Sequence, residues 1–163
     1  MILIKNTAMK YLITIIFITI VNTTFAQQVD KEFINPFRIK PSGYTHTVVS
    51  ASGRTIYISG QVPVNEAGQV VGEGDLKAQT KQVYDNLLYC LRFAGARFED
   101  VVKMTTYVVN YKPSDIDIVR EVRKGYLSKE NPPASTLVGV QALAHPDYMI
   151  EIEAIAVIPD KGN

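Results

Sequence analysis

Residues 149–158 read Met-Ile-Glu-Ile-Glu-Ala-Ile-Ala-Val-Ile, and this stretch decides the fold class. Isoleucine and valine are branched at Cβ and favour extended backbone, so the stretch predicts a β-strand. Glu151 and Glu153 are separated by one residue and therefore point to the same face of that strand. The other positions on both faces are apolar, which is typical of a strand buried on both sides. We therefore expect helices to cover one face of the sheet and further copies of the chain to cover the other.

Four more β-rich stretches lie upstream of this strand. The first two are separated only by Ala51-Ser52-Gly53-Arg54, a short link that predicts a β-hairpin. Later in the chain, strand–helix–strand connections imply that some strands pair in parallel. The four predicted strands are residues 45–50, 55–59, 101–109 and 136–140.

The first of two predicted helices begins after residue 74. Apolar residues recur there at spacings of three and four, from Leu76 to Ala94, and so form one stripe. Asp75 is placed to accept hydrogen bonds from the free N–H groups of the first turn. Gly95 suits the position that ends a helix.

The second predicted helix follows Ser114, which is placed to cap it, and stops before Asn131-Pro132-Pro133. Its apolar stripe runs through Ile116, Val119, either Val122 or Arg123, and Tyr126. We expect Arg120 and Arg123 to form a solvated face of this helix. The element order is then ββαβαββ, an α+β fold in which two helices cover one face of a mixed sheet.

The first 26 residues have the pattern of a secretory signal peptide. Lys5 and Lys10 precede an apolar stretch of about eleven residues, too short to cross a bilayer as a permanent helix. Thr24 and Ala26 then supply the small residues of a cleavage site. We expect residues 1–26 to be removed and the protein to be exported to the periplasm. Residues 27–42 should form a polar leader, irregular or at a sheet edge, and residues 43–163 a single domain.

Composition excludes several classes of function. Removal of Lys5 and Lys10 with the signal takes the formal charge from +1 to −1, which leaves no basic surface for nucleic acid or anionic lipid. His46 and His145 have no further histidine or cysteine at metal-binding spacing, so no metal site is predicted. The glycine-rich loops that hold dinucleotides or nucleotide phosphates are absent from the sequence, and no cofactor is expected.

Several motifs in order resemble the RidA (YjgF, L-PSP) family. They span most of the chain from about Gly43 to Val157. The motifs are Ser-Gly-Gln-Val-Pro at 59–63, Gln-Thr-Lys-Gln-Val at 79–83, Asp-Val-Val-Lys-Met-Thr at 100–105 and Glu-Ile-Glu-Ala-Ile-Ala at 151–156. The resemblance implies a chorismate-mutase-like subunit, assembled as a homotrimer with ligand clefts between neighbouring subunits.

The resemblance also implies a set of site residues and one departure from the family pattern. In the family's deaminases, which hydrolyse enamines or imines, the arginine of a Pro-Ala-Arg-Ser motif binds the substrate carboxylate. Here the motif reads Pro-Ala-Ser-Thr at 133–136, so Ser135 replaces that arginine. A hydroxyl carries no charge. Without the charged hydrogen bond of an arginine, binding of the substrate carboxylate should be weaker by about 2–5 kcal/mol. The other implied site residues are Glu151, which would hold the hydrolytic water, and Tyr44, Gly60, Gln61 and Thr136, which would line the cleft.

Three functions remain open from the sequence. The first is a hydrolase acting on a small imine or enamine, in which another cation replaces the missing arginine. The second is a non-catalytic trimer whose clefts bind a neutral or hydroxylated small metabolite. The third is an endoribonuclease, which the near-neutral charge argues against.

Overall fold

The computed structural model describes residues 29–38 and 41–160. The predicted signal peptide, residues 1–26, lies outside these ranges, so export stays a prediction. In the described ranges, no helix has both the length and the apolar character needed to cross a membrane.

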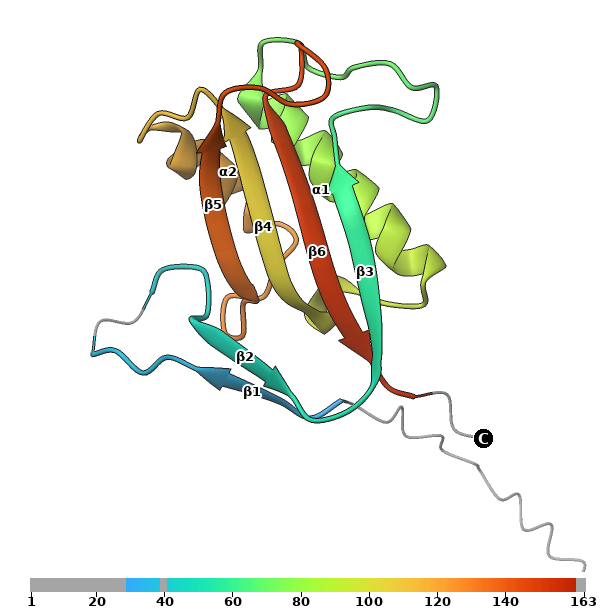
Figure 1. The fold of residues 1–163 in the computed structure, drawn as a ribbon, viewed down its shortest axis with the longest axis vertical. Coiled ribbons are helices and arrows are strands. Elements are labelled where there is room, and N and C mark those ends of the chain that lie inside the picture. Colours follow the sequence, from blue (N-terminus) through green and yellow to red (C-terminus); the bar gives the residue numbers. More distant parts are fainter. Residues whose placement is uncertain (1–28, 39–40, 161–163) are drawn as a thin grey trace, which may run out of the picture.

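A mixed four-stranded sheet forms the centre of the described chain, with strand order β3 (Arg54–Gln61), β6 (Ile150–Ile158), β4 (Val101–Val109), β5 (Ala134–Val140). Strand β6 pairs antiparallel with both β3 and β4, whereas β4 and β5 pair in parallel. Helices α1 (Leu76–Phe93) and α2 (Asp115–Arg123) lie on one face of this sheet, behind it in Figure 1. The α+β fold, the parallel pairing and the placement of both helices confirm the sequence prediction.

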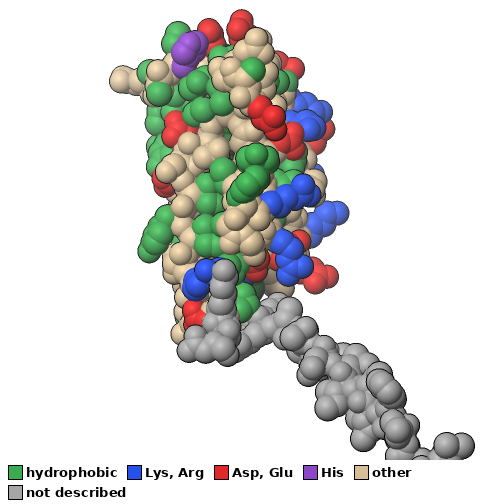
Figure 2. Space-filling view, turned by 90° about the vertical axis from the view of Figure 1, so that its right-hand side faces the viewer, with side chains coloured by type: hydrophobic (Ala, Val, Ile, Leu, Met, Phe, Trp, Pro, Cys, Tyr) green, Lys and Arg blue, Asp and Glu red, His purple; other side chains and the backbone are tan. Residues whose placement is uncertain are grey.

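Strand β6 has one face in the core and one on the open side of the sheet. Ile150, Ile152 and Ala156 are completely buried beneath the helices, and they pack there with Leu87 of α1. The opposite face carries the half-buried Glu151 and Ile155 and the exposed Glu153. Seen from the β3 edge, charged side chains gather mainly on the helix side, while hydrophobic and uncharged atoms predominate towards the open sheet (Figure 2). A subunit contact that covers the open face remains a prediction.

The predicted hairpin between residues 45–50 and 55–59 is wrong. Strand β2 (Thr47–Ser50) pairs instead with β1 (Lys31–Ile34), a strand within the predicted leader, and forms a separate two-stranded sheet. Strand β3 pairs with β6, in register from Arg54 opposite Ile158. The nine-residue, apolar β6 offers β3 a longer ladder than the four-residue β2 could. Gly53, with φ of +114°, lets the chain turn between the two sheets.

Of the two residues predicted to cap helices, Asp75 of α1 does so and Ser114 of α2 does not. Asp75 caps α1 as expected, because its Oδ1 accepts hydrogen bonds from the N–H groups of Lys77 at 2.9 Å and Ala78 at 3.1 Å. Ser114 makes no such bond at the start of α2. Asp115 satisfies the local backbone instead, accepting from the N–H of Lys112 at 2.7 Å.

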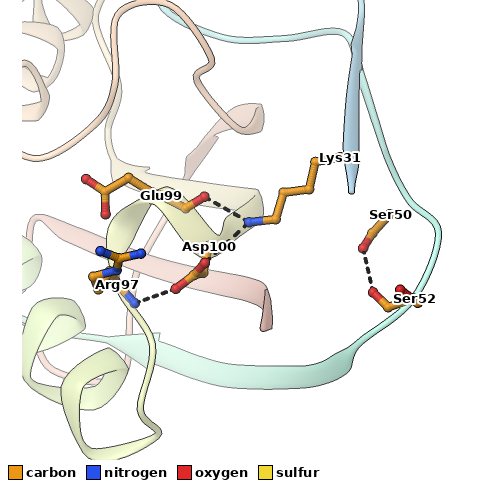
Figure 3. A network of polar contacts seen from close by, with 6 residues as sticks. All are labelled: Lys31, Ser50, Ser52, Arg97, Glu99 and Asp100. Carbon is orange, nitrogen blue, oxygen red and sulfur yellow. Dashed lines mark hydrogen bonds and ion pairs between the residues drawn. The ribbon is translucent and has the colours of Figure 1, made fainter. Parts of the chain in front are cut away.

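Lys31 fixes β1 to the turn that precedes β4 (Figure 3). Its Nζ donates to the carbonyl oxygen of Glu99 at 2.9 Å and lies 3.5 Å from Oδ1 of Asp100, in the short helix η1 (Phe98–Asp100). The Lys31 side chain is only 9% exposed. Burial lowers the pKa of Lys31, which Asp100 partly offsets. The two-stranded sheet is thus attached to the main sheet through a nearly buried charge.

Replacing Asp100 with asparagine is expected to lower the free energy of unfolding by about 1–3 kcal/mol, because the Lys31 charge then stays buried without its counter-charge. In the structure, the backbone N–H of Arg97 donates to Oδ2 of Asp100 at 2.9 Å, and the side-chain oxygen of asparagine can still accept this bond. Lys31→Met should cost less, since it removes the buried charge together with its desolvation. Urea unfolding measures both, and a larger loss in Lys31→Met than in Asp100→Asn would contradict this account.

Candidate functional site

Glu151 lies directly against the backbone of Gly60. The ladder between β3 and β6 is irregular between Ile58 and Gln61, so the chain bulges at Ser59 and Gly60 beside the glutamate. A Cβ built on Gly60 would overlap the Oε1 of Glu151 and approach its Cδ to 2.6 Å. Only glycine leaves room for the carboxylate at this place.

The Glu151 carboxylate accepts no hydrogen bond and forms no ion pair within the described residues, although it is half-buried. Its neighbour Glu153 does have a partner, because the Oη of Tyr107 donates to Glu153 Oε1 at 3.3 Å. Burial raises the pKa of Tyr107, and both glutamates add to the effect. The phenol therefore stays protonated at neutral pH. Glu151 is left as an acceptor open to a water molecule or a ligand.

A second group of predicted site residues surrounds the start of β5. Thr45 fixes the segment after Gly43 there, because its N–H donates to the carbonyl oxygen of Pro133 at 3.1 Å and its Oγ1 donates to that of Pro132 at 2.6 Å. Tyr44 thus lies beside the strand that carries Ser135 and Thr136.

The two adjacent residues of β5 point to opposite faces. Ser135 is opposite the buried Met104 of β4 and so faces the helix side, as does Leu137, which packs against the core. Thr136 faces the open side, where its Oγ1 accepts from Nζ of Lys103 at 2.6 Å. Burial lowers the pKa of Lys103, partly offset by Glu153.

One subunit does not bring all the predicted site residues together. Strand β4 separates β6 from β5, and Glu151 is in register with Tyr107, whereas Ser135 is in register with Met104. Glu151 and Gly60 form one group, with Gln61 next to them and bonded back to the carbonyl oxygen of Ser59 at 3.1 Å. Tyr44, Ser135 and Thr136 form the other group, at the far edge of the sheet. No three His, Cys, Asp or Glu side chains in the described ranges are grouped to hold a metal ion.

The structure decides between two positions that the sequence allowed for Arg123. It could lie in the apolar stripe of α2 or on a solvated face, and the solvated face is wrong: Arg123 is half-buried. Its guanidinium lies against Gly43, so that a Cβ there would come within 3.4 Å of Cζ. The signal was present in the spacing, because position 123 is four residues after the buried Val119 and three before Tyr126.

The fold and the two groups of residues define a class of protein: a chorismate-mutase-like α+β subunit with both helices on one sheet face and, on the other, a half-buried glutamate beside a glycine bulge. The sequence model of the family described as Endoribonuclease L-PSP matches residues 38–158. The chain belongs to this family, also called RidA or YjgF.

Relatives in several organisms agree with this assignment. A RutC family protein of Pyrococcus horikoshii is 38% identical over 118 residues, which cover 72% of this chain and 89% of the relative. The human 2-iminobutanoate/2-iminopropanoate deaminase is 36% identical over 104 residues, 64% of this chain and 73% of that protein. Among solved structures, the Rid-family protein YyfB of Yersinia pestis, described as of unknown function, is 44% identical with a TM-score of 0.71, covering 78% of this chain and 98% of its own.

Proposed function

We propose that the protein is a hydrolase of small imine or enamine metabolites, in which the carboxylate of Glu151 holds the attacking water. The observation that carries this proposal is the unpaired, half-buried Glu151 carboxylate seated on Gly60. An acceptor without a protein donor at a sheltered surface is suited to bind water and to take its proton. The name of the human relative, an imine deaminase, supports the same chemistry.

The reaction needs only water and a proton acceptor. Glu151 accepts a proton as the water oxygen adds to the imine carbon, which gives a carbinolamine. Glu151 then gives this proton to nitrogen and takes the hydroxyl proton as the C–N bond breaks, so that ammonia leaves and a carbonyl group remains. An enamine enters the same path after protonation at carbon, so no cofactor is required for either substrate.

The proposed site is a cleft between neighbouring subunits of a homotrimer. Two features support this arrangement: the separation of Glu151 from Ser135 within one subunit, and the open sheet face, where Tyr57 is 79% exposed. A neighbour that covers this face would bring its own Tyr44 and Ser135 towards Glu151. Light scattering coupled to size exclusion should give three times the subunit mass, and a monomer would contradict the shared cleft.

The decisive test is an assay with 2-iminobutanoate, formed in situ from 2-aminobutanoate by an L-amino-acid oxidase. The purified protein should speed the appearance of 2-oxobutanoate above the uncatalysed rate. If the protein binds 2-oxobutanoate but does not speed hydrolysis, the non-catalytic metabolite-binding function replaces the proposal. Cleavage of RNA that survives purification and disappears in Glu151→Gln would instead favour the ribonuclease.

A further inference from the structure

A guanidinium without an acidic partner lies at the end of α2. Arg123 is half-buried, and in the described ranges no carboxylate or carbonyl oxygen accepts a hydrogen bond from its side chain. Its helix neighbour Arg120 lies 3.9 Å from Asp117, so that acid is already engaged. Sheltering a positive group without pairing it is unfavourable, and such groups in proteins normally have an anionic partner.

Neither Tyr84 nor Asp85 supplies this negative charge. Burial raises the pKa of Tyr84, so this phenol stays neutral, despite the opposing effect of Arg123. Asp85 accepts a hydrogen bond from the Oη of Tyr126 at 2.7 Å and one from Nζ of Lys81 at 2.6 Å. Burial lowers the pKa of Arg123, yet a guanidinium remains charged at neutral pH. The guanidinium is therefore a half-buried positive group without an acidic partner among the described residues, and its nitrogens remain accessible at the surface.

The guanidinium is placed where a ligand of the proposed cleft would reach it. It packs on Gly43, the residue before Tyr44, and Thr45 ties this segment to Pro132 and Pro133 at the start of β5. Ser135, on the helix side of β5, lies two residues further along. The cation thus borders the same group of residues that has lost the motif arginine.

We infer that Arg123 is the anion-binding residue of the cleft and that it takes the carboxylate of a small 2-imino or 2-oxo acid. The inference rests on the proposed function for the position of the cleft. A guanidinium offers paired N–H donors that match the two oxygens of a carboxylate. The positive charge that is missing at Ser135 of β5 is then supplied by Arg123 of α2. This argues against the alternative in which the cleft binds a neutral metabolite.

Two probes of similar shape, 2-oxobutanoate and its amide, differ in whether they carry a negative charge. Both are titrated into the full assembly by calorimetry, so that the effect of charge on affinity is measured apart from the effect of shape. Arg123→Gln should weaken binding of the acid by roughly 30-fold or more, and binding of the amide by less than about threefold. Arg123→Lys should retain part of the affinity for the acid. The control is Lys124→Gln, which removes one exposed charge from the adjacent position and should change neither affinity.

Adding Ser135→Arg to Arg123→Gln should restore acid binding, because it returns a guanidinium to β5. Equal losses for the acid and the amide, an unchanged affinity in Arg123→Gln, or a wild type that does not bind the acid would each overturn the inference. A changed assembly mass in Arg123→Gln would also do so, because it would show that Arg123 pairs with a neighbouring subunit. Imine hydrolysis measured on the same proteins tests the role of Arg123 and the proposed hydrolase function separately. If the protein hydrolyses the imine but Arg123 does not affect acid binding, only this inference is wrong. If Arg123 binds the acid but no imine is hydrolysed, only the proposed function is wrong.

Discussion

Replacing Glu151 with glutamine is expected to lower kcat for 2-iminobutanoate hydrolysis by about 10²- to 10⁴-fold, the usual contribution of a general base. Glutamine keeps the shape of the side chain but cannot take a proton from water. KM should change little, because the acid group of the substrate is bound elsewhere. Steady-state rates with the imine formed in situ measure both constants.

The matched control for this variant is Glu153→Gln. Glu153 lies on the same face two residues further along β6, but it is exposed and engaged by Tyr107. Its replacement should leave kcat within a few-fold of the wild type. Equal losses in the two variants would show that general charge on the open face, and no particular carboxylate, drives the reaction.

Gly60→Ala is expected to lower kcat by about 10²-fold without unfolding the protein, since a displacement of roughly 1 Å at a reacting group has effects of this size. The added methyl would occupy the space of the Glu151 carboxylate, which must turn away. Circular dichroism and the kinetic assay together check the result.

Gly125→Ala serves as the control for this change, because the nearest atom to its added Cβ is the carbonyl oxygen of Val122 at 3.5 Å, an ordinary contact. That variant should keep full activity. If Gly60→Ala also keeps full activity, then the position of the carboxylate on the glycine bulge does not matter for hydrolysis.

Local patterns predicted the elements well but not all of their neighbours. The apolar pattern of residues 149–158 correctly predicted a strand there, which is β6, and Asp75 marked the start of α1 because a side-chain cap depends only on adjacent residues. The hairpin prediction failed because a short link shows that two strands are close in sequence and does not show which partner offers more ladder bonds. Strand β6, about a hundred residues away from β3, was the better partner.

In the candidate site, too, some features could be predicted from the sequence and others need the tertiary structure. The proposed role of Glu151 and the replacement at Ser135 could be predicted from the sequence only with the help of a family resemblance. The contact between Gly60 and Glu151 needs the bulge in β3, and the position of Arg123 needs the packing of α2 on the segment at Gly43. Both contacts depend on tertiary structure, although the helical spacing already allowed Arg123 in the apolar stripe of α2.

The central place of β6 has a consequence for how the chain matures. Strands β3 and β4 are joined in the sheet only through β6, the last strand of the described chain. During synthesis, neither can complete its ladder until residues 150–158 have left the ribosome. Such distant pairings also form slowly. A nascent chain of this topology is expected to stay unfolded until its last strand has been made, a delay that is compatible with the predicted export.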